Sequence, residues 1–172
     1  MGEQQLVSYS PDNALIIQSD RTVLLDVHAP RAEDAQADIA PFAELIKSPE
    51  HIHTYRLSPL SIWNARAAGM LVADMVTALQ ANAKYPMPES VAQEIEALGE
   101  RYGLTTLKPG SKDDSSVLSA LVLQVEDKPL AELLKRHEQV GPLLGEQLSS
   151  TTFAIELGDR GLLKQALLAA GY

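Results

Sequence analysis

Cysteine is absent from all 172 residues of this chain. A chain without cysteine can have no disulfide framework, no thiolate zinc site and no cysteine nucleophile. Long apolar runs are missing too, since none approaches the ~20 residues that cross a bilayer. The first residues also lack the basic start and apolar run of a signal peptide. We therefore expect a cytoplasmic protein that makes no contact with a membrane.

Positive charge is scarce, because 14 Lys and Arg stand against 23 Asp and Glu and give a net charge of −9 at pH 7. The phosphate backbone of DNA attracts basic surfaces, so an acidic domain can touch it only through a local basic patch. The remaining composition is ordinary, with 45% hydrophobic and 22% charged residues. These values predict a packed globular core rather than disorder.

Sequence signatures of catalysis are missing as well. Neither the Gly-x-x-x-x-Gly-Lys-Ser/Thr phosphate loop nor Gly-x-Gly-x-x-Gly occurs, so no nucleotide site is recognisable. The one local cluster that could bind a metal is Glu50-His51-Ile52-His53, because residues two apart on a strand face the same side. A third ligand is not evident, and surface or packed histidines are the favoured interpretation. We expect no metal, no cofactor and no catalytic residue, hence no enzymatic activity in this chain.

Hydrophobic spacing and turn residues divide the chain into short elements. A β-hairpin is predicted over 14–27, and two short helices over 31–47, where Pro41 interrupts the helical spacing. A strand over 51–57 follows. It ends where Ser58 and Pro59 form a favourable helix start, as N-cap and first helical residue. Three helices are then predicted over 58–68, 71–83 and 88–102.

Two extended runs come next, over 104–107 and 117–125, joined by a polar loop over 108–116. A strand, three helices and a hairpin stand in the order of a winged helix. The remaining residues predict a helix over 128–137, a strand over 152–157 and a helix over 159–170. No internal repeat is evident.

The fold class expected from this order is α+β. A winged-helix-like three-helix centre with a β-hairpin wing would be flanked by a small α/β lobe, built from the N-terminal hairpin and the C-terminal strand and helix. The corresponding segments are 1–50, 51–126 and 127–172. Winged helices serve both as DNA readers and as protein-docking modules, so this order leaves the function open.

The third predicted helix would enter the major groove in a DNA-reading winged helix. It is acidic, since Glu89, Glu94, Glu96 and Glu100 oppose only Arg101. We therefore predict that this helix does not read DNA.

Phosphate contacts would then fall to a few basic residues elsewhere. Arg56 and Arg66 flank the first helix of the centre, and Lys108 and Lys112 lie in the predicted wing loop. Of these, the wing lysines are the best candidates, and a solvated surface position is the alternative for each. Trp63 is predicted to anchor the core rather than to stack on a base.

The stretch from Pro41 to Gly69 resembles the N-terminal region of bacterial XPB-type DNA helicases. Further resemblance lies in residues 15–27, 84–88, 101–103, 142–145 and 163–168, so it covers almost the whole chain. It implies a non-catalytic accessory domain that precedes two RecA-like motor domains of a superfamily 2 helicase, acting in repair or transcription-linked unwinding. The implied partners are the motor domains in cis, DNA and partner proteins.

Two rival interpretations stay open. The net charge and the acidic third helix favour a stand-alone protein-interaction or autoregulatory module that binds no DNA. A hydrolase built on His51 and His53 would instead take up a metal ion.

Overall fold

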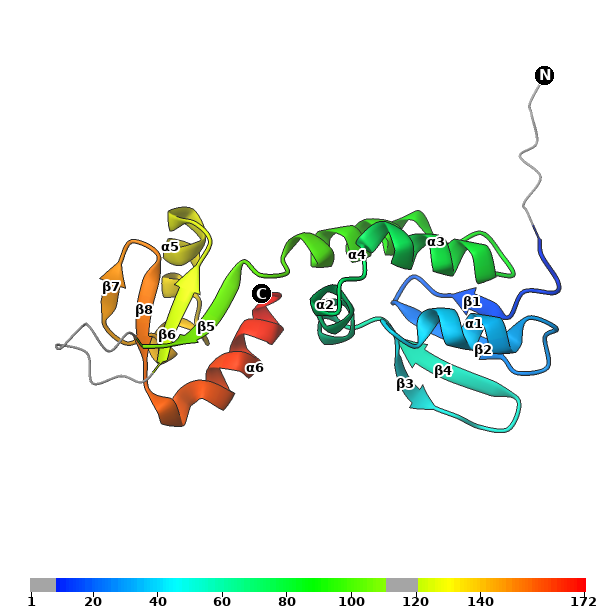
Figure 1. Cartoon of the computed structure of the whole chain (residues 1–172), viewed down its shortest axis with the longest axis horizontal. Coiled ribbons are helices and arrows are strands. Elements are labelled where there is room, and N and C mark those ends of the chain that lie inside the picture. Colours follow the sequence, from blue (N-terminus) through cyan, green and yellow to red (C-terminus); the bar gives the residue numbers. More distant parts are fainter. Residues whose placement is uncertain (1–8, 111–120) are drawn as a thin grey trace, which may run out of the picture. The chain divides into compact units, whose positions relative to one another are not determined.

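The chain divides into two compact units, Met1–Glu100 and Arg101–Tyr172. The computed structural model describes residues 9–110 and 121–172, and within them each unit has its own four-stranded antiparallel sheet and its own hydrophobic core (Figure 1). The α+β class predicted from the sequence is thereby confirmed. Helices long and apolar enough to cross a membrane do not occur in these two described ranges.

In the first unit one helix separates two strand pairs of a sheet, and three helices follow the last strand (Figure 1). Its sheet has the strand order β1-β2-β4-β3. The strands are β1 (Leu15–Ile17), β2 (Thr22–Asp26), β3 (Glu44–Lys47) and β4 (Ile52–Arg56), and the helices are α1 (Ala32–Ile39), α2 (Pro59–Ala67), α3 (Val72–Asn82) and α4 (Glu89–Glu100).

Local sequence explains where α2 begins and ends. The Ser58 hydroxyl accepts a hydrogen bond from the backbone N–H of Ser61 at 3.1 Å, and the Ser61 hydroxyl accepts one from the backbone N–H of Ser58 at 3.0 Å. This reciprocal capping satisfies two donors that the first turn leaves free. Shortly after the helix, Gly69 adopts a φ of 94°, a value that side chains disfavour. The predicted helix start at Ser58 and Pro59 is confirmed.

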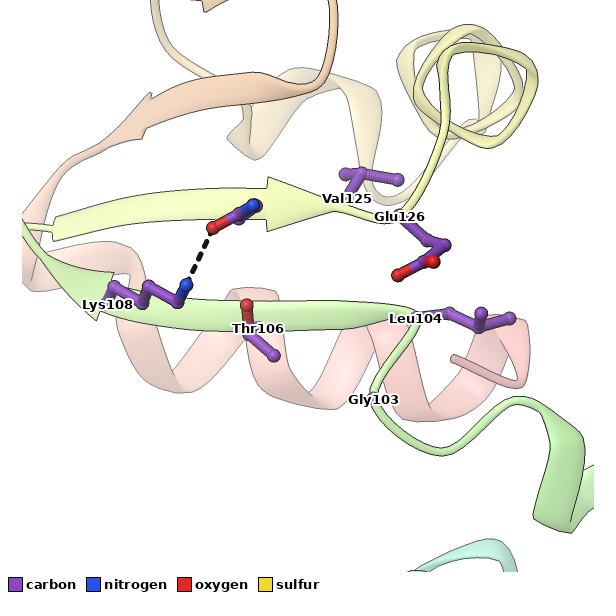
Figure 2. Close-up of a pocket in the computed structure, with 7 residues that line it drawn as sticks. Gly103, Leu104, Thr106, Lys108, Val125 and Glu126 are labelled. Carbon is purple, nitrogen blue, oxygen red and sulfur yellow. Dashed lines mark hydrogen bonds between the residues drawn. The ribbon is translucent and has the colours of Figure 1, made fainter.

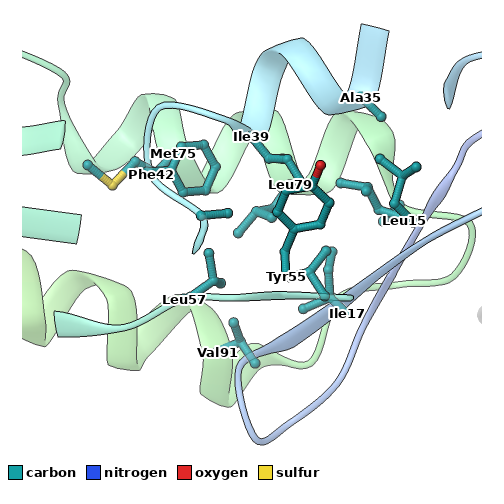
Figure 3. Packing of buried hydrophobic residues seen from close by; sticks show 14 of the residues in the cluster. Leu15, Ile17, Ala35, Ile39, Phe42, Tyr55, Leu57, Met75, Leu79 and Val91 are labelled. Carbon is teal, nitrogen blue, oxygen red and sulfur yellow. The ribbon is translucent and has the colours of Figure 1, made fainter. Parts of the chain in front are cut away.

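One face of the first sheet packs against helices. Helix α1 contacts β2, and α3 contacts both α1 and β1. Figure 3 shows Leu15 of β1, Tyr55 of β4, Ile39 of α1 and Leu79 of α3 converging on one cluster. Each such side chain stabilises the fold by about 1.5–3 kcal/mol on burial. This packing fixes β2 and β4, and therefore the loops that follow and precede them.

Residues 44–47 depart from the sequence prediction, because they form the edge strand β3 rather than a second helix. Only residues 40–47 lie between Ile39, the last residue of α1, and Ser48. A helix of this length interrupted by Pro41 is marginal by itself, whereas pairing with β4 satisfies the backbone of residues 44–47. Leu45 and Ile46 are 50% and 43% exposed. Their helical spacing therefore did not reflect burial.

The second unit contains the remaining elements in the strand order β5-β6-β8-β7. Its core centres on Leu123, Phe153 and Leu163, all at most 1% exposed. The strands are β5 (Thr105–Pro109), β6 (Leu121–Val125), β7 (Gln147–Ser149) and β8 (Thr152–Ile155), the helices are α5 (Lys128–Arg136) and α6 (Arg160–Ala170), and two short 3₁₀ turns are η1 (Gly141–Leu143) and η2 (Leu157–Asp159).

The sheet topology corrects the prediction that the N-terminal hairpin and the C-terminal strand share one sheet. Strand β2 pairs with β4, and β8 pairs with β6. Closing a shorter loop costs less entropy, so each hairpin pairs with strands nearby in sequence. The boundary after Glu100 also falls inside the segment 51–126 that was predicted as winged-helix-like. Helices α2–α4 belong to the first unit, while the β5–β6 hairpin belongs to the second.

The two sheets repeat one topology. In each, a hairpin, a helix and a second hairpin follow in order, and the second and fourth strands pair at the centre. Val23 lies opposite Tyr55 in the first sheet, as Leu123 lies opposite Phe153 in the second. Register shifts occur at the matching places, Leu45/Lys47 and Gln147/Ser149. The sequence conceals this repeat because equivalent positions share only apolar character.

Candidate nucleic-acid interface

Lys108 lies on the solvent-facing side of the β5–β6 hairpin, in a concavity of about 220 Å³. Alternation along the strands sends Leu123 and Val125 into the core and leaves Thr106, Lys108 and Gln124 exposed. The concavity is lined by Gly103, Leu104, Thr106, Lys108, Gln124, Val125 and Glu126 (Figure 2).

Polar groups converge on this concavity from both strands. The Lys108 ammonium donates to Gln124 Oε1 at 2.7 Å, and Thr106 lies directly opposite Gln124 across the strand pair. Glu126 lies near Leu104, away from Lys108 (Figure 2). The Lys108 end therefore offers an ammonium, a hydroxyl and an amide, groups that commonly contact phosphate oxygens. The Glu126 carboxylate would repel an anion at the other end.

Gln124, Thr106 and Glu126 were not among the candidates from sequence. The signal that could have found them is alternation, since residues two apart on a strand share a face. Alternation alone does not give the partner across the hairpin, however. The long loop between the strands left the register of β5 against β6 open, and with it the position of Gln124 beside Lys108. Lys112, the other wing candidate, lies outside the described residues.

Arg56 lies at the end of β4 in the first unit and is exposed. Its cross-strand neighbour on β3 is Glu44. The pKa of Asp20 is lowered, chiefly because the backbone N–H of Thr22 donates to its carboxylate at 3.0 Å, and to a smaller extent by the charge of Arg56. Two carboxylates thus share the field of this guanidinium, which weakens its attraction for phosphate.

Arg66 is bound to its own helix end. Its guanidinium donates from Nη1 to the carbonyl oxygen of Met70 at 3.3 Å, just beyond the C-terminus of α2. A cation in this position complements the partial negative charge of the last carbonyls. Arg56 and Arg66 belong to the first unit and Lys108 to the second, so the predicted candidates do not form one patch within a unit.

The acidic helix α4 (Glu89–Glu100) forms close to its predicted range, 88–102, while its role toward DNA stays a prediction. In α4, Glu89, Glu94, Glu96 and Glu100 are exposed, and Glu94 pairs with Arg21 at 3.1 Å. Trp63 is half-buried against the core, and its indole N–H donates to the carbonyl oxygen of Leu98 at 2.7 Å. The tryptophan therefore joins α2 to α4, and its prediction as a core anchor is confirmed.

The histidines are arranged differently from the Glu50–His53 cluster considered in the sequence. His53 pairs with Leu25 on β2 and is half-buried, while His51 precedes β4 and contacts His28. The described ranges, 9–110 and 121–172, contain no group of three or more His, Asp or Glu side chains that could hold a metal ion.

Each of the two units combines a small antiparallel sheet with helices, and the second unit carries a polar concavity on its sheet. Comparison with known proteins shows the family to which the chain belongs. Residues 15–149 match the family model described as "Helicase conserved C-terminal domain", and the chain belongs to that family.

Relatives covering nearly the whole chain are DNA helicases by name. The "DNA 3'-5' helicase XPB" of Kineococcus radiotolerans is 41% identical over 161 residues, and that of Mycobacterium tuberculosis is 38% identical over 161 residues. Each alignment covers 94% of this chain and 28% of the relative. The chain therefore corresponds to a piece of an XPB-type helicase and spans little more than a quarter of such a protein.

A eukaryotic relative matches a shorter part. The yeast "General transcription and DNA repair factor IIH helicase/translocase subunit XPB/SSL2" is 33% identical over 101 residues, which is 56% of this chain and 12% of that protein. The resemblance to XPB-type helicases found in the sequence is confirmed. The family description names a C-terminal domain, whereas the resemblance implied a region ahead of the motor.

Proposed function

We propose that this chain is a non-catalytic accessory domain of an XPB-like superfamily 2 DNA helicase, which lies ahead of the motor domains and engages DNA for unwinding or repair. The observation that carries the proposal is the 38–41% identity to bacterial helicases named XPB over 94% of the chain. The parent protein is then an ATP-dependent, cytoplasmic helicase, and its motor domains are partners of this chain in cis.

The concavity around Lys108 is the DNA contact in this proposal. Its ammonium, the Thr106 hydroxyl and the Gln124 amide stand on an exposed sheet face where a phosphate can approach. Contact through phosphate alone gives little base specificity, so the domain would position DNA rather than read its sequence. The acidic exposed face of α4 would point away from the DNA, because four carboxylates beside phosphates are unfavourable.

A fluorescence titration of the chain with forked and single-stranded DNA tests this proposal. At low salt the chain should bind both, and log K should fall linearly with log salt concentration, with a shallow slope that corresponds to one or a few phosphates. An absence of binding at low salt would refute the DNA role. Incubation with ATP and forked DNA should release no phosphate, since the proposal assigns hydrolysis to the motor.

A docking role is the second candidate, and the net charge of −9 with the exposed acidic face of α4 favours it. Under this proposal the chain binds the motor core, or another partner protein, without DNA. Co-purification of the chain with a separately expressed motor core separates the two roles. Binding in trans without DNA supports docking, and binding only when DNA is present supports the accessory DNA role.

A further inference from the structure

His28 and His51 meet at one edge of the first unit. His28 lies in the connection after β2, and His51 immediately precedes β4. The Nε2 atom of His28 is 2.8 Å from the Nδ1 atom of His51, and the ring centroids are 5.1 Å apart. The two residues are 23 positions apart in the sequence, which is why no local spacing pattern indicates the pair.

The sheet holds the two backbone segments in place. Strands β2 and β4 pair with Asp26 opposite Ile52, and one residue further on the backbone N–H of Val27 donates to the carbonyl oxygen of His51 at 3.2 Å. The two histidines thus extend from the end of a paired ladder. Because strands β2 and β4 are paired in the folded first unit, their backbones hold the side chains of His28 and His51 close to each other.

Asp26 braces the connection that carries His28. Its Oδ1 accepts from the backbone N–H of His28 at 3.0 Å, and its Oδ2 accepts from the Lys84 ammonium at 2.8 Å. Both carboxylate oxygens are therefore engaged. Asp26 acts as a positioning residue, and the two imidazole rings supply the ligand nitrogens.

From this geometry we infer that His28 and His51 form a two-nitrogen chelating site for a borderline divalent transition-metal ion such as Zn²⁺, Ni²⁺ or Cu²⁺. Two nitrogens bound to one zinc at about 2.0–2.1 Å lie about 2.9 Å apart at a right angle and about 3.3 Å apart at the tetrahedral angle. The two nitrogens are 2.8 Å apart and the ring centroids 5.1 Å apart, so the nitrogens must separate by a few tenths of an ångström and both rings must turn about their side-chain torsions for the lone pairs to converge on one ion.

A metal ion can also replace the hydrogen bond between His28 and His51 without a change of protonation state. In the pair, one nitrogen carries a proton and the other presents a lone pair. Both rings are exposed, so the protonated ring can move its proton to its other nitrogen, where water accepts the hydrogen bond. Two lone pairs then face the ion, and water fills the remaining positions. Imidazole ligands favour zinc, nickel and copper over Mg²⁺ and Ca²⁺, which need oxygen ligands.

Isothermal titration of the tag-free chain with ZnCl₂, and separately with MgCl₂, tests the inference. We expect one zinc ion per chain and no magnesium binding. The variants His28→Gln and His51→Gln should each weaken zinc binding by at least about tenfold, because each removes one of only two protein ligands. The double variant should lose the weak zinc binding that one remaining imidazole supports, so its zinc affinity should not exceed that of either single variant.

His137→Gln is the matched control. His137 lies in the second unit, where its Nδ1 accepts from the backbone N–H groups of Gln139 and Val140, so its loss should leave zinc affinity unchanged. Circular dichroism of each variant checks that the fold is retained. Zinc affinity of His51→Gln within twofold of wild type, or equal weakening in His137→Gln, would overturn the site. Zinc should also raise the Tm of the wild-type chain but not of either single variant.

Discussion

Gly99 is buried in α4, where it faces Val72 at the start of α3. In an exposed helix, replacing glycine by alanine stabilises the fold by about 1 kcal/mol, because alanine has the better helix propensity. At Gly99 an added Cβ would fall well inside van der Waals contact with Cγ2 of Val72. Valine is stiff at χ1, so it cannot turn away cheaply. Overpacking of this kind typically costs about 1–3 kcal/mol.

The Gly99→Ala variant should therefore be destabilised by up to about 2 kcal/mol, the overpacking cost less the propensity gain. Chemical denaturation followed by Trp63 fluorescence measures this loss of stability. The single tryptophan reports on α4, the helix of Gly99, because its indole N–H donates to the carbonyl oxygen of Leu98. In a Val72→Ala background the clash is gone, and Gly99→Ala should become stabilising by about 1 kcal/mol.

Gly161 provides the matched control, because it also lies in a helix but an added Cβ there would meet nothing within 4 Å. Gly161→Ala should stabilise the chain by up to about 1 kcal/mol, as measured by circular dichroism. If Gly99→Ala proved as stabilising as Gly161→Ala in the wild-type background, the close packing of α4 on α3 would be wrong.

Two further predictions concern polar contacts of the first unit. Trp63→Phe removes the 2.7 Å hydrogen bond to the carbonyl oxygen of Leu98 and should cost about 1–2 kcal/mol of unfolding free energy by urea denaturation; an unchanged midpoint would contradict the tie between α2 and α4. The pKa of Asp26 is lowered, chiefly by the hydrogen bond that its carboxylate accepts from Lys84. The stabilisation from this ion pair is therefore fully present above the ordinary carboxyl pKa of about 3.9. It is lost as the pH falls through the lower pKa of the folded state. Lys84→Met should thus lower the free energy of unfolding by about 1–3 kcal/mol at pH 7, and by progressively less below about pH 4. Denaturation of the wild-type chain and the variant at a series of pH values measures this difference. A difference that stays constant down to pH 2 would contradict the ion pair.

Helix-capping and turn residues made most of the elements predictable from the sequence. Ser58, Pro59 and Gly69 mark the ends of α2, and Gly171, with a φ of 86°, ends α6 as predicted. These residues act locally, Ser58 through its hydroxyl and the glycines through their backbone conformation, and need no tertiary information. The edge strand β3 was not predictable in this way, because its pairing with β4 is a tertiary choice that overrode helical spacing.

The strand pairing and the contacts between distant side chains could not be predicted from the sequence for a similar reason. Nothing in one strand tells which strand it will pair with, so the repeat of the two sheets appeared only in the structure. The same holds for the sites. Lys108 could be selected as a lone basic residue, but Gln124 beside it and the pairing of His28 with His51 depend on register across strands.

A matched pair of lysines offers the most direct test of the central claim that this domain engages DNA through the β5–β6 face. Lys108 and Lys135 both lie in the second unit, are both exposed, and both donate to a glutamine oxygen, Gln124 at 2.7 Å and Gln147 at 3.1 Å. The measurement is the affinity of Lys108→Gln and Lys135→Gln for forked DNA across a salt series.

We predict that Lys108→Gln weakens DNA binding and reduces the salt slope by about 1, the loss of one phosphate contact, while Lys135→Gln binds like the wild-type chain. Equal slopes for both variants and the wild-type chain would contradict it.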